Sequence, residues 1–236
     1  MTSVPIDETA AKPGAADLLE IFYAPRAVFA RRTNGEFGLP LLALAIVVAI
    51  VTVATASLMQ PLWDVMIAKS MAARPGITPE QIAAGKSIGE KFAMIGQVVT
   101  FVLLPFIVAL LVWIVGRFTD VKVRYGVAAM IATFSLFPRV IGLIVAAVEM
   151  AFMSDTAITS PTVLTLSPAR FVDAAHAPIL AGALSRFDLF TLWSIFLIAV
   201  GLEVTMRVTR GRAWTTALIV WIIGFLPAIW QAVKSM

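Results

Sequence analysis

Long runs without a charged side chain alternate with short basic segments along most of this sequence. No charge occurs between Glu36 and Asp64, or between Lys91 and Arg117. About 20 consecutive apolar residues are enough for a helix to cross the hydrocarbon core of a bilayer. The pattern therefore predicts an all-α fold, a polytopic integral membrane protein built as a bundle of five transmembrane helices. The expected spans lie at about residues 37–58, 92–116, 125–148, 189–204 and 213–232.

The residues before the first span form two segments of different character. Residues 1–16 are small, polar and acidic, which predicts a flexible tail without the apolar core of a signal peptide. In residues 17–34 the apolar positions share one helical face, which is rimmed by Arg26, Arg31 and Arg32. This predicts an amphipathic interfacial helix in the headgroup region. Packing against the cytoplasmic ends of the bundle is an equally open alternative.

Residues 35–236 are expected to form the five-span membrane domain, with its longest connections on the outer side. Thr78, Pro79 and Gln81 follow the pattern of an N-cap, a proline in the first helical position and a capping box. We expect a short helix there that runs almost directly into the second span. The connection at 149–187 has apolar patches too short to span, so a short helix on the outer face is expected.

Basic residues are concentrated in the two shortest connections between spans. Because Lys and Arg favour short cytoplasmic loops, both turns are expected on the cytoplasmic side. This predicts a cytoplasmic N-terminus and an outer C-terminus, and the short tail favours a bacterial cytoplasmic (inner) membrane. The residues expected to contact the lipid surface are Arg26, Arg31, Arg32, Arg207, Arg210 and Arg212.

The composition agrees with a membrane location and removes several classes of function. Hydrophobic residues make up 60% of the chain, charged residues 14%, and the mean hydropathy is +0.95, whereas a soluble domain is roughly a quarter charged. The formal net charge of +4 comes from residues beside the spans. That placement suits an anionic lipid surface, so nucleic acid is not an expected partner. The absence of cysteine excludes disulfides, thiolate nucleophiles and cysteine metal ligands.

Arg139 is the sharpest candidate for a functional side chain, because it lies well inside the third predicted span. A cation at such a depth costs roughly 2.5–3.5 kcal/mol on insertion scales, so it needs a partner or a wet cavity. Asp188 and Glu149 are the carboxylates expected within its reach. The arginine then forms either a site for a lipid headgroup, an anion or a proton, or a structural ion pair between spans three and four. Snorkelling toward the interface is a further alternative, and we favour a structural role.

Two other sets of residues are weaker candidates. Glu203 precedes Arg207 by four positions, the favourable order for a helical ion pair, and the alternative is a proton or cation ligand within the membrane. Pro105, Pro138 and Pro227 indicate kinks that serve packing or, alternatively, broken helices around a transport site. We favour the ion pair and the plain kinks.

Catalytic and metal-binding patterns are missing from the sequence. His176 is the only histidine, and without cysteine or clustered carboxylates it is interpreted as a surface residue. No HExxH, P-loop, GxSxG or GxGxxG pattern occurs. We therefore expect a protein that is not an enzyme and that uses no cofactor and no metal ion.

Three features resemble one family of membrane proteins. They are the amphipathic opening LLEIFYAPRAVF, the five-span spacing, and the last hairpin, LWSIFLIAVGLEVTMRVTRGRAWTTALIVWII. Together they resemble the YIP (Ypt/Rab-interacting-protein-like) family of five-span membrane proteins in its short-tailed bacterial form. The resemblance implies a bundle whose eukaryotic relatives assist vesicle traffic by binding small prenylated GTPases.

Three functional hypotheses follow from these observations, and the weakest is an intramembrane enzyme acting on lipids, because the sequence offers few carboxylates near Arg139. The first is a non-enzymatic scaffold or assembly/trafficking factor of the YIP type that binds protein or lipid partners. The alternative is a small transporter or channel that uses Arg139 and the proline-broken spans. Membrane lipids are expected partners, and another membrane protein or a second copy of the chain are the further partner classes.

Overall fold

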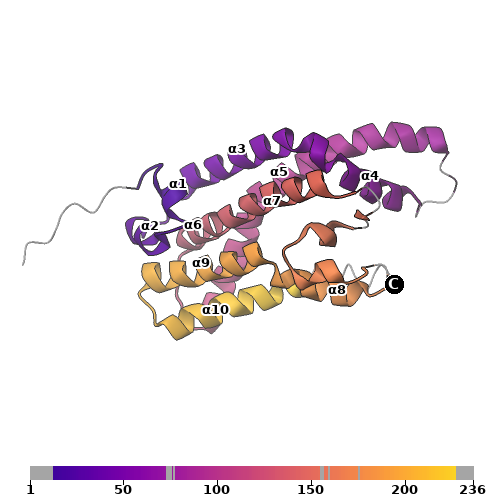
Figure 1. Ribbon diagram of the computed structural model, residues 1–236. Coiled ribbons are helices and arrows are strands. Elements are labelled where there is room, and N and C mark those ends of the chain that lie inside the picture. Colours follow the sequence, from indigo (N-terminus) through magenta and orange to yellow (C-terminus); the bar gives the residue numbers. More distant parts are fainter. Residues whose placement is uncertain are drawn as a thin grey trace, which may run out of the picture.

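The computed structural model describes residues 13–72, 76, 78–154, 157–158, 160–174 and 176–226, and all regular structure within them is helical. This confirms the predicted all-α class, and the helices form one elongated bundle (Figure 1). In chain order the elements are α1 (Asp17–Glu20), α2 (Pro25–Arg31), α3 (Gly38–Ala54), α4 (Ala56–Ala72), α5 (Pro79–Phe118), α6 (Tyr125–Ser135), α7 (Phe137–Phe152), η2 (Pro161–Leu164), η3 (Pro168–Phe171), α8 (Pro178–Leu184), η4 (Ser185–Phe187), α9 (Leu189–Met206) and α10 (Arg210–Ile223).

Three helical stretches in the described part are long and apolar enough to cross a bilayer. They are Ile88–Phe118 in α5, Tyr125–Phe152 in α6 and α7, and Leu189–Met206, which is α9. Helices α3 and α4 add a fourth span if this bent pair is taken as one. The predicted span at 213–232 extends past residue 226, the last one described. Pro227 and the C-terminus also lie outside the described residues. The structure thus supports a helical membrane protein with three or four spans by this measure, and the count of five remains a prediction.

The first predicted span, residues 37–58, is interrupted near its outer end. Helix α3 ends at Ala54 and α4 begins at Ala56, and the two helices are bent by 81°. Between them, Thr55 Oγ1 donates to the carbonyl oxygen of Val51 at 2.8 Å. Such a back-bond from a threonine hydroxyl tends to bend a helix. Residues 56–58 therefore continue into α4 instead of extending the span.

Local signals in the sequence mark the ends of two other helices. Thr78 Oγ1 accepts from the backbone N–H of Gln81 at 3.3 Å, and Gln81 Oε1 accepts from the N–H of Thr78 at 3.0 Å, so the predicted capping box is confirmed. The helix that it starts, α5, continues for 40 residues and includes the second span. The third span divides at Leu136, because Pro138 follows at the start of α7 and has no N–H to continue the ladder of α6.

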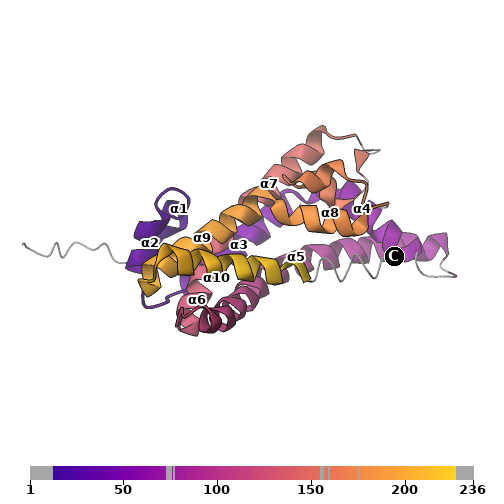
Figure 2. The ribbon, with the colours of Figure 1, turned by 90° about the horizontal axis from the view of Figure 1, so that it is seen from below.

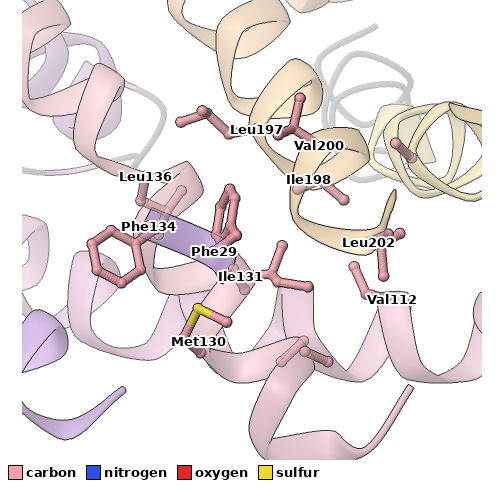
Figure 3. Packing of buried hydrophobic residues seen from close by; sticks show 14 of the residues in the cluster. Phe29, Val112, Met130, Ile131, Phe134, Leu136, Leu197, Ile198, Val200 and Leu202 are labelled. Carbon is pink, nitrogen blue, oxygen red and sulfur yellow. The ribbon is translucent and has the colours of Figure 1, made fainter. Parts of the chain in front are cut away.

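The centre of the core lies where α2, α6 and α9 meet. Phe29, Phe134 and Leu197 are fully buried there, and Figure 3 shows Phe29 among side chains from α6 and α9. The rings of Phe29 and Phe134 pack edge to face with their centroids 6.1 Å apart. Gly201 allows α9 to come this close, since a Cβ at that position would lie 2.8 Å from Cγ2 of Ile131.

Helices α1 and α2 lie beside α9 at one end of the bundle in both views (Figures 1 and 2). Their apolar face packs on protein, because Ile21, Val28 and Phe29 are fully buried. Leu19 and Tyr23 point away and are 71% and 74% exposed. In this structure the amphipathic segment packs against the bundle, which is the alternative that its sequence left open. Residues 1–12 of the predicted flexible tail lie outside the described residues.

The two basic turns lie together at the same end as α1 and α2. The hydroxyl oxygens of Thr119, at the end of α5, and Thr216, in the second turn of α10, are 2.6 Å apart. The segments η2, η3, α8 and η4 gather at the opposite end, where α7 diverges from α5 (Figure 2). The bundle therefore has one end with short basic turns and one end with longer connections.

Candidate functional site

Arg139 lies in the first turn of α7, directly after the break in the third span. Its backbone N–H donates to the carbonyl oxygen of Leu136 at 3.0 Å, which tightens this turn. Arg139 lies 14 positions after Tyr125, which at about 1.5 Å per residue is about 21 Å along the helix axis. It is therefore near the middle of the stretch Tyr125–Phe152 and well inside a hydrocarbon core of about 30 Å.

A second arginine, Arg186, approaches the same place from η4. Arg139, Arg186 and Asp188 line one cavity of about 500 Å³. A second cavity of about 580 Å³ adjoins it, and Leu104, Arg139, Arg186 and Thr191 line both. Cavities of roughly 300–1,000 Å³ are usual for small-molecule sites. The two arginines thus meet at the junction of two hollows of ligand size.

Arg186 is held against the end of α10. Trp221 Nε1 donates to the backbone oxygen of Arg186 at 3.2 Å, and the guanidinium lies 5.6 Å from the ring centroid of Phe225. Gly224 leaves room for it, since a Cβ there would lie 2.5 Å from Nη2 of Arg186. The Nε atom is buried without a hydrogen-bond partner. Burial lowers the pKa of Arg186, and the positive charge of Arg139 lowers it further.

Asp188 contributes the one carboxylate that lines this cavity, but it also serves the backbone of α9. Its Oδ1 accepts from the N–H groups of Phe190 and Thr191 at 3.0 and 3.1 Å, which makes it the N-cap of α9. Among the described residues no ion pair joins it to Arg139. The structure thus brings Arg139 and Asp188 into one cavity without forming the direct structural pair that we favoured.

The other two predicted carboxylates have different partners. Glu149 contacts Arg170, with Oε1 at 3.3 Å from Nη1, and it does not line the cavity of Arg139. Glu203 accepts from Arg26 Nη2 at 2.5 Å, so in this structure its partner is Arg26 and not Arg207. Helix α9 ends at Met206, and Arg207 adopts a left-handed conformation with φ of 50°. The side chain of Arg207 therefore leaves the helical face on which a pair four residues apart would form.

Two of the six arginines expected at the lipid surface are instead bound to a buried carboxylate. Arg32 Nε donates to Asp17 Oδ2 at 2.7 Å, and Arg31 Nη2 is 2.5 Å from Asp17 Oδ1. Asp17 and Arg32 are each 2% exposed, and Arg31 also pairs with Glu20. Burial raises the pKa of Asp17, but the hydrogen bonds from Arg31, Gly14 and Arg32 outweigh this and hold it below the usual 3.8.

The remaining four predicted lipid contacts are accessible. Arg26 is 61% exposed in its side chain while it pairs with Glu203, and three arginines of the last basic turn are exposed: Arg207, Arg210 and Arg212. Their contact with lipid remains a prediction. Arg186 was not among the predicted site residues, because its local sequence does not separate it from the other basic residues of the outer connection. The only signal in the sequence that placed Arg186 near the site was its position two residues before Asp188, the N-cap of α9.

Groups suited to catalysis or metal binding are scarce in the part of the chain that the structure describes. No three His, Asp or Glu side chains there lie close enough to hold a metal ion. His176 is exposed and contacts Asp173, with Nδ1 2.6 Å from Oδ2. A catalytic role, a metal and a cofactor are thus neither indicated nor tested by this geometry.

Apolar helices of spanning length, joined by basic turns, define a helical integral membrane protein. The Yip1 domain family matches residues 19–231, and the chain therefore belongs to that family, as the resemblance in its sequence predicted. The membrane protein YknW of Bacillus subtilis (strain 168) is 28% identical over 144 residues, which are 61% of this chain and 60% of that relative's length. No solved structure matches the chain.

Proposed function

We propose that this protein is a non-enzymatic scaffold or assembly factor of the Yip1 family that binds an anionic partner within the membrane. One observation carries the proposal: Arg139 and Arg186 share a cavity with a single carboxylate, Asp188. Two cations and one anion leave an excess of positive charge at membrane depth. Such a charge is costly unless a partner neutralises it.

The chemistry around the two arginines favours binding over catalysis. The lining residues are mainly apolar, with Thr100, Thr165, Ser185 and Thr191 as the hydroxyl-bearing side chains of the first cavity. Among the described residues, no histidine and no carboxylate other than Asp188 lines either cavity. A general base or an activated nucleophile needs such a group within hydrogen-bond reach. The site is therefore suited to holding a ligand.

Native mass spectrometry of the gently solubilised protein tests this function. We expect the wild type to carry a bound anionic molecule that Arg139→Leu and Arg186→Leu both lose. Lys122→Gln, an exposed change at the opposite end, is the matched control and should keep the molecule. A wild-type spectrum with no bound mass, or one unchanged in both arginine variants, would contradict the proposal.

We further propose five spans, a cytoplasmic N-terminus and an outer C-terminus in a bacterial inner membrane. The contact between Thr119 and Thr216 supports this topology, because it places both basic turns on one side. The chain has no cysteine, so single cysteines report cleanly on each side. In intact cells a membrane-impermeant maleimide should label Phe171→Cys, and it should label Lys122→Cys only after permeabilisation. The reverse pattern would invert the topology.

A small transporter or channel is the second candidate function. It is favoured by the break between α6 and α7 at Leu136, which lies beside Arg139 and the second cavity. Discontinuous helices often form substrate sites near the middle of a transporter. This function requires anion flux in reconstituted vesicles that Arg139→Leu abolishes while the protein still folds. An absence of anion flux in vesicles with the wild-type protein would rule out the transporter or channel function.

A further inference from the structure

The two cavities that meet at the arginines differ in their surroundings. The first extends toward the connections at the end opposite the basic turns, and its lining includes Pro161, Thr165 and Ser185. The second lies between α5, α9 and α10 and is lined by aliphatic side chains such as Val108, Ile198 and Val220. The first cavity thus offers polar groups beside these connections, and the second offers an apolar hollow within the bundle.

We propose that the paired cavities bind one glycerophospholipid, with its phosphate between Arg139 and Arg186 and an acyl chain in the cavity between α5 and α10. This inference rests on the proposed function and names the class of ligand for the same site. The lipid comes from the leaflet opposite the basic turns, because the first cavity is lined by residues of η2, η4 and the start of α9 at that end.

The donors present at the junction fit a phosphate. A guanidinium offers its N–H groups in a planar fork that matches phosphate oxygens, and such charge-assisted bonds are about twice as strong as neutral ones. The Nε atom of Arg186 is buried without a partner. Among the described residues no hydrogen bond or ion pair joins Asp188 to either arginine, and its Oδ1 accepts two backbone N–H groups of α9. A phosphodiester between the two arginines therefore supplies the missing acceptors and one negative charge.

The second cavity separates a lipid from a free anion. Its apolar walls would gain nothing from inorganic phosphate, whereas an acyl chain makes van der Waals contacts with them and fills the cavity. Exposed aliphatic side chains stand at its edge, with Ile107 55% and Leu226 62% exposed. A lipid chain therefore has an apolar route from the surrounding bilayer into the cavity.

Titration of delipidated full-length protein with defined probes tests this site, with bound mass read by native mass spectrometry. The probes are phosphatidylglycerol, a diacylglycerol with the same chains, and inorganic phosphate. We expect one tightly held phosphatidylglycerol and no retained diacylglycerol. Arg139→Gln and Arg186→Gln should each weaken phosphatidylglycerol binding roughly tenfold or more, as expected for a lost hydrogen bond to a charged group. Lys122→Gln should leave binding unchanged.

Two further measurements keep the proposal falsifiable if an arginine variant folds poorly. Val108→Phe narrows the apolar cavity while both arginines stay, so it should weaken phosphatidylglycerol binding, and Arg186→Lys should retain part of it. Equal retention of diacylglycerol, or displacement of the lipid by an equal concentration of inorganic phosphate, would overturn the assignment.

The outcome also separates this inference from the proposed function. If the native protein carries an anionic molecule that depends on Arg139, but phosphatidylglycerol does not bind, the function stands and the lipid assignment fails. If no anionic molecule depends on either arginine, the proposed function itself fails.

Discussion

The two ends of the bundle hold their arginines in opposite ways, since Arg32 is buried whereas Arg139 and Arg186 are only half-buried. Where α1 and α2 dock, Arg32 donates to Asp17 and also to the backbone oxygens of Gly14 and Glu36, at 3.0 and 3.1 Å. At the other end, Arg186 has a buried Nε without a partner, and Arg139 shares a cavity with a carboxylate that already caps a helix.

Under the function proposed above, this difference separates a structural arginine from one that binds a ligand. Fully paired charges hold two segments together, and removing one partner leaves a costly buried charge. Charges that the protein leaves partly unpaired keep their capacity for a ligand. The position of Arg139 inside a predicted span does not by itself make this distinction. The hydrogen-bond acceptors that surround each guanidinium do.

Asp17→Asn should have the largest effect on stability. It removes the carboxylate that both Arg31 and Arg32 contact and leaves Arg32 buried without a counter-ion. We expect a loss of about 3–5 kcal/mol, the usual cost of breaking a buried pair, measured by denaturant unfolding in detergent. Glu20→Gln is the control, because Glu20 contacts Arg31 alone and is part-exposed; it should cost at most about 1 kcal/mol. Equal losses of unfolding free energy in the two variants would show that Asp17 stabilises the fold no more than Glu20 does.

Arg139→Leu, unlike Asp17→Asn, should have little effect on stability. Since no ion pair joins Arg139 to another described residue, its removal should change the unfolding free energy of the delipidated protein by less than about 1 kcal/mol. The bound anionic molecule should nevertheless be lost. A loss of stability as large as that of Asp17→Asn would instead make Arg139 a structural residue, and the two ends would then be alike.

The pH dependence of stability should come largely from the end that holds Asp17. The folded state holds the pKa of Asp17 below 3.8, so its contribution is complete above the unfolded pKa. That contribution is lost as the pH falls through the folded pKa. The melting temperatures of wild type and Asp17→Asn should therefore converge as the pH falls from about 5 to about 2. A constant difference over this range would show that the carboxylate charge is not what stabilises the wild type.

Gly224→Ala should have the smallest effect and sharpen the description of the arginine cavity. The added Cβ would lie 2.5 Å from Nη2 of Arg186, at the end of a flexible side chain that can move. We expect a few-fold loss of phosphatidylglycerol binding with little change in melting temperature. Gly211→Ala is the matched control in the same helix, since its Cβ would meet no atom within 4 Å. Identical binding by the two variants would place Arg186 outside the site.

Signals that depend on neighbours in sequence were predictive of the fold. The Thr78 capping box starts α5, and Pro138 marks the division of the third span. The bend at Thr55 was not predicted, because both sides of it are equally apolar. Hydropathy likewise does not report whether lipid or protein covers an apolar face, so the docking of α1 and α2 stayed an alternative.

The candidate site was only half predictable for a related reason. Depth in the membrane identified Arg139, and the start of α9 identified Asp188. Arg186 reaches the cavity only because the connection before α9 folds back onto Trp221 and Phe225. The pair of Arg26 with Glu203 joins residues 177 positions apart, whereas local spacing could propose only Arg207. Long-range partners of this kind leave no pattern in a single sequence.

The docking of α2 onto α9 also has a consequence for biosynthesis. At about 5–20 residues per second, the 177 residues between Arg26 and Glu203 take roughly 9–35 s to translate. During that interval Phe29 and its neighbours have no protein surface from α9 to cover them, and the membrane interface is the apolar phase at hand. The interfacial position that the sequence predicts for this helix then applies to the nascent chain, before α9 has been made. A photo-crosslinker at Phe29 should reach lipid in chains stalled before residue 189 and lose that contact in the finished protein.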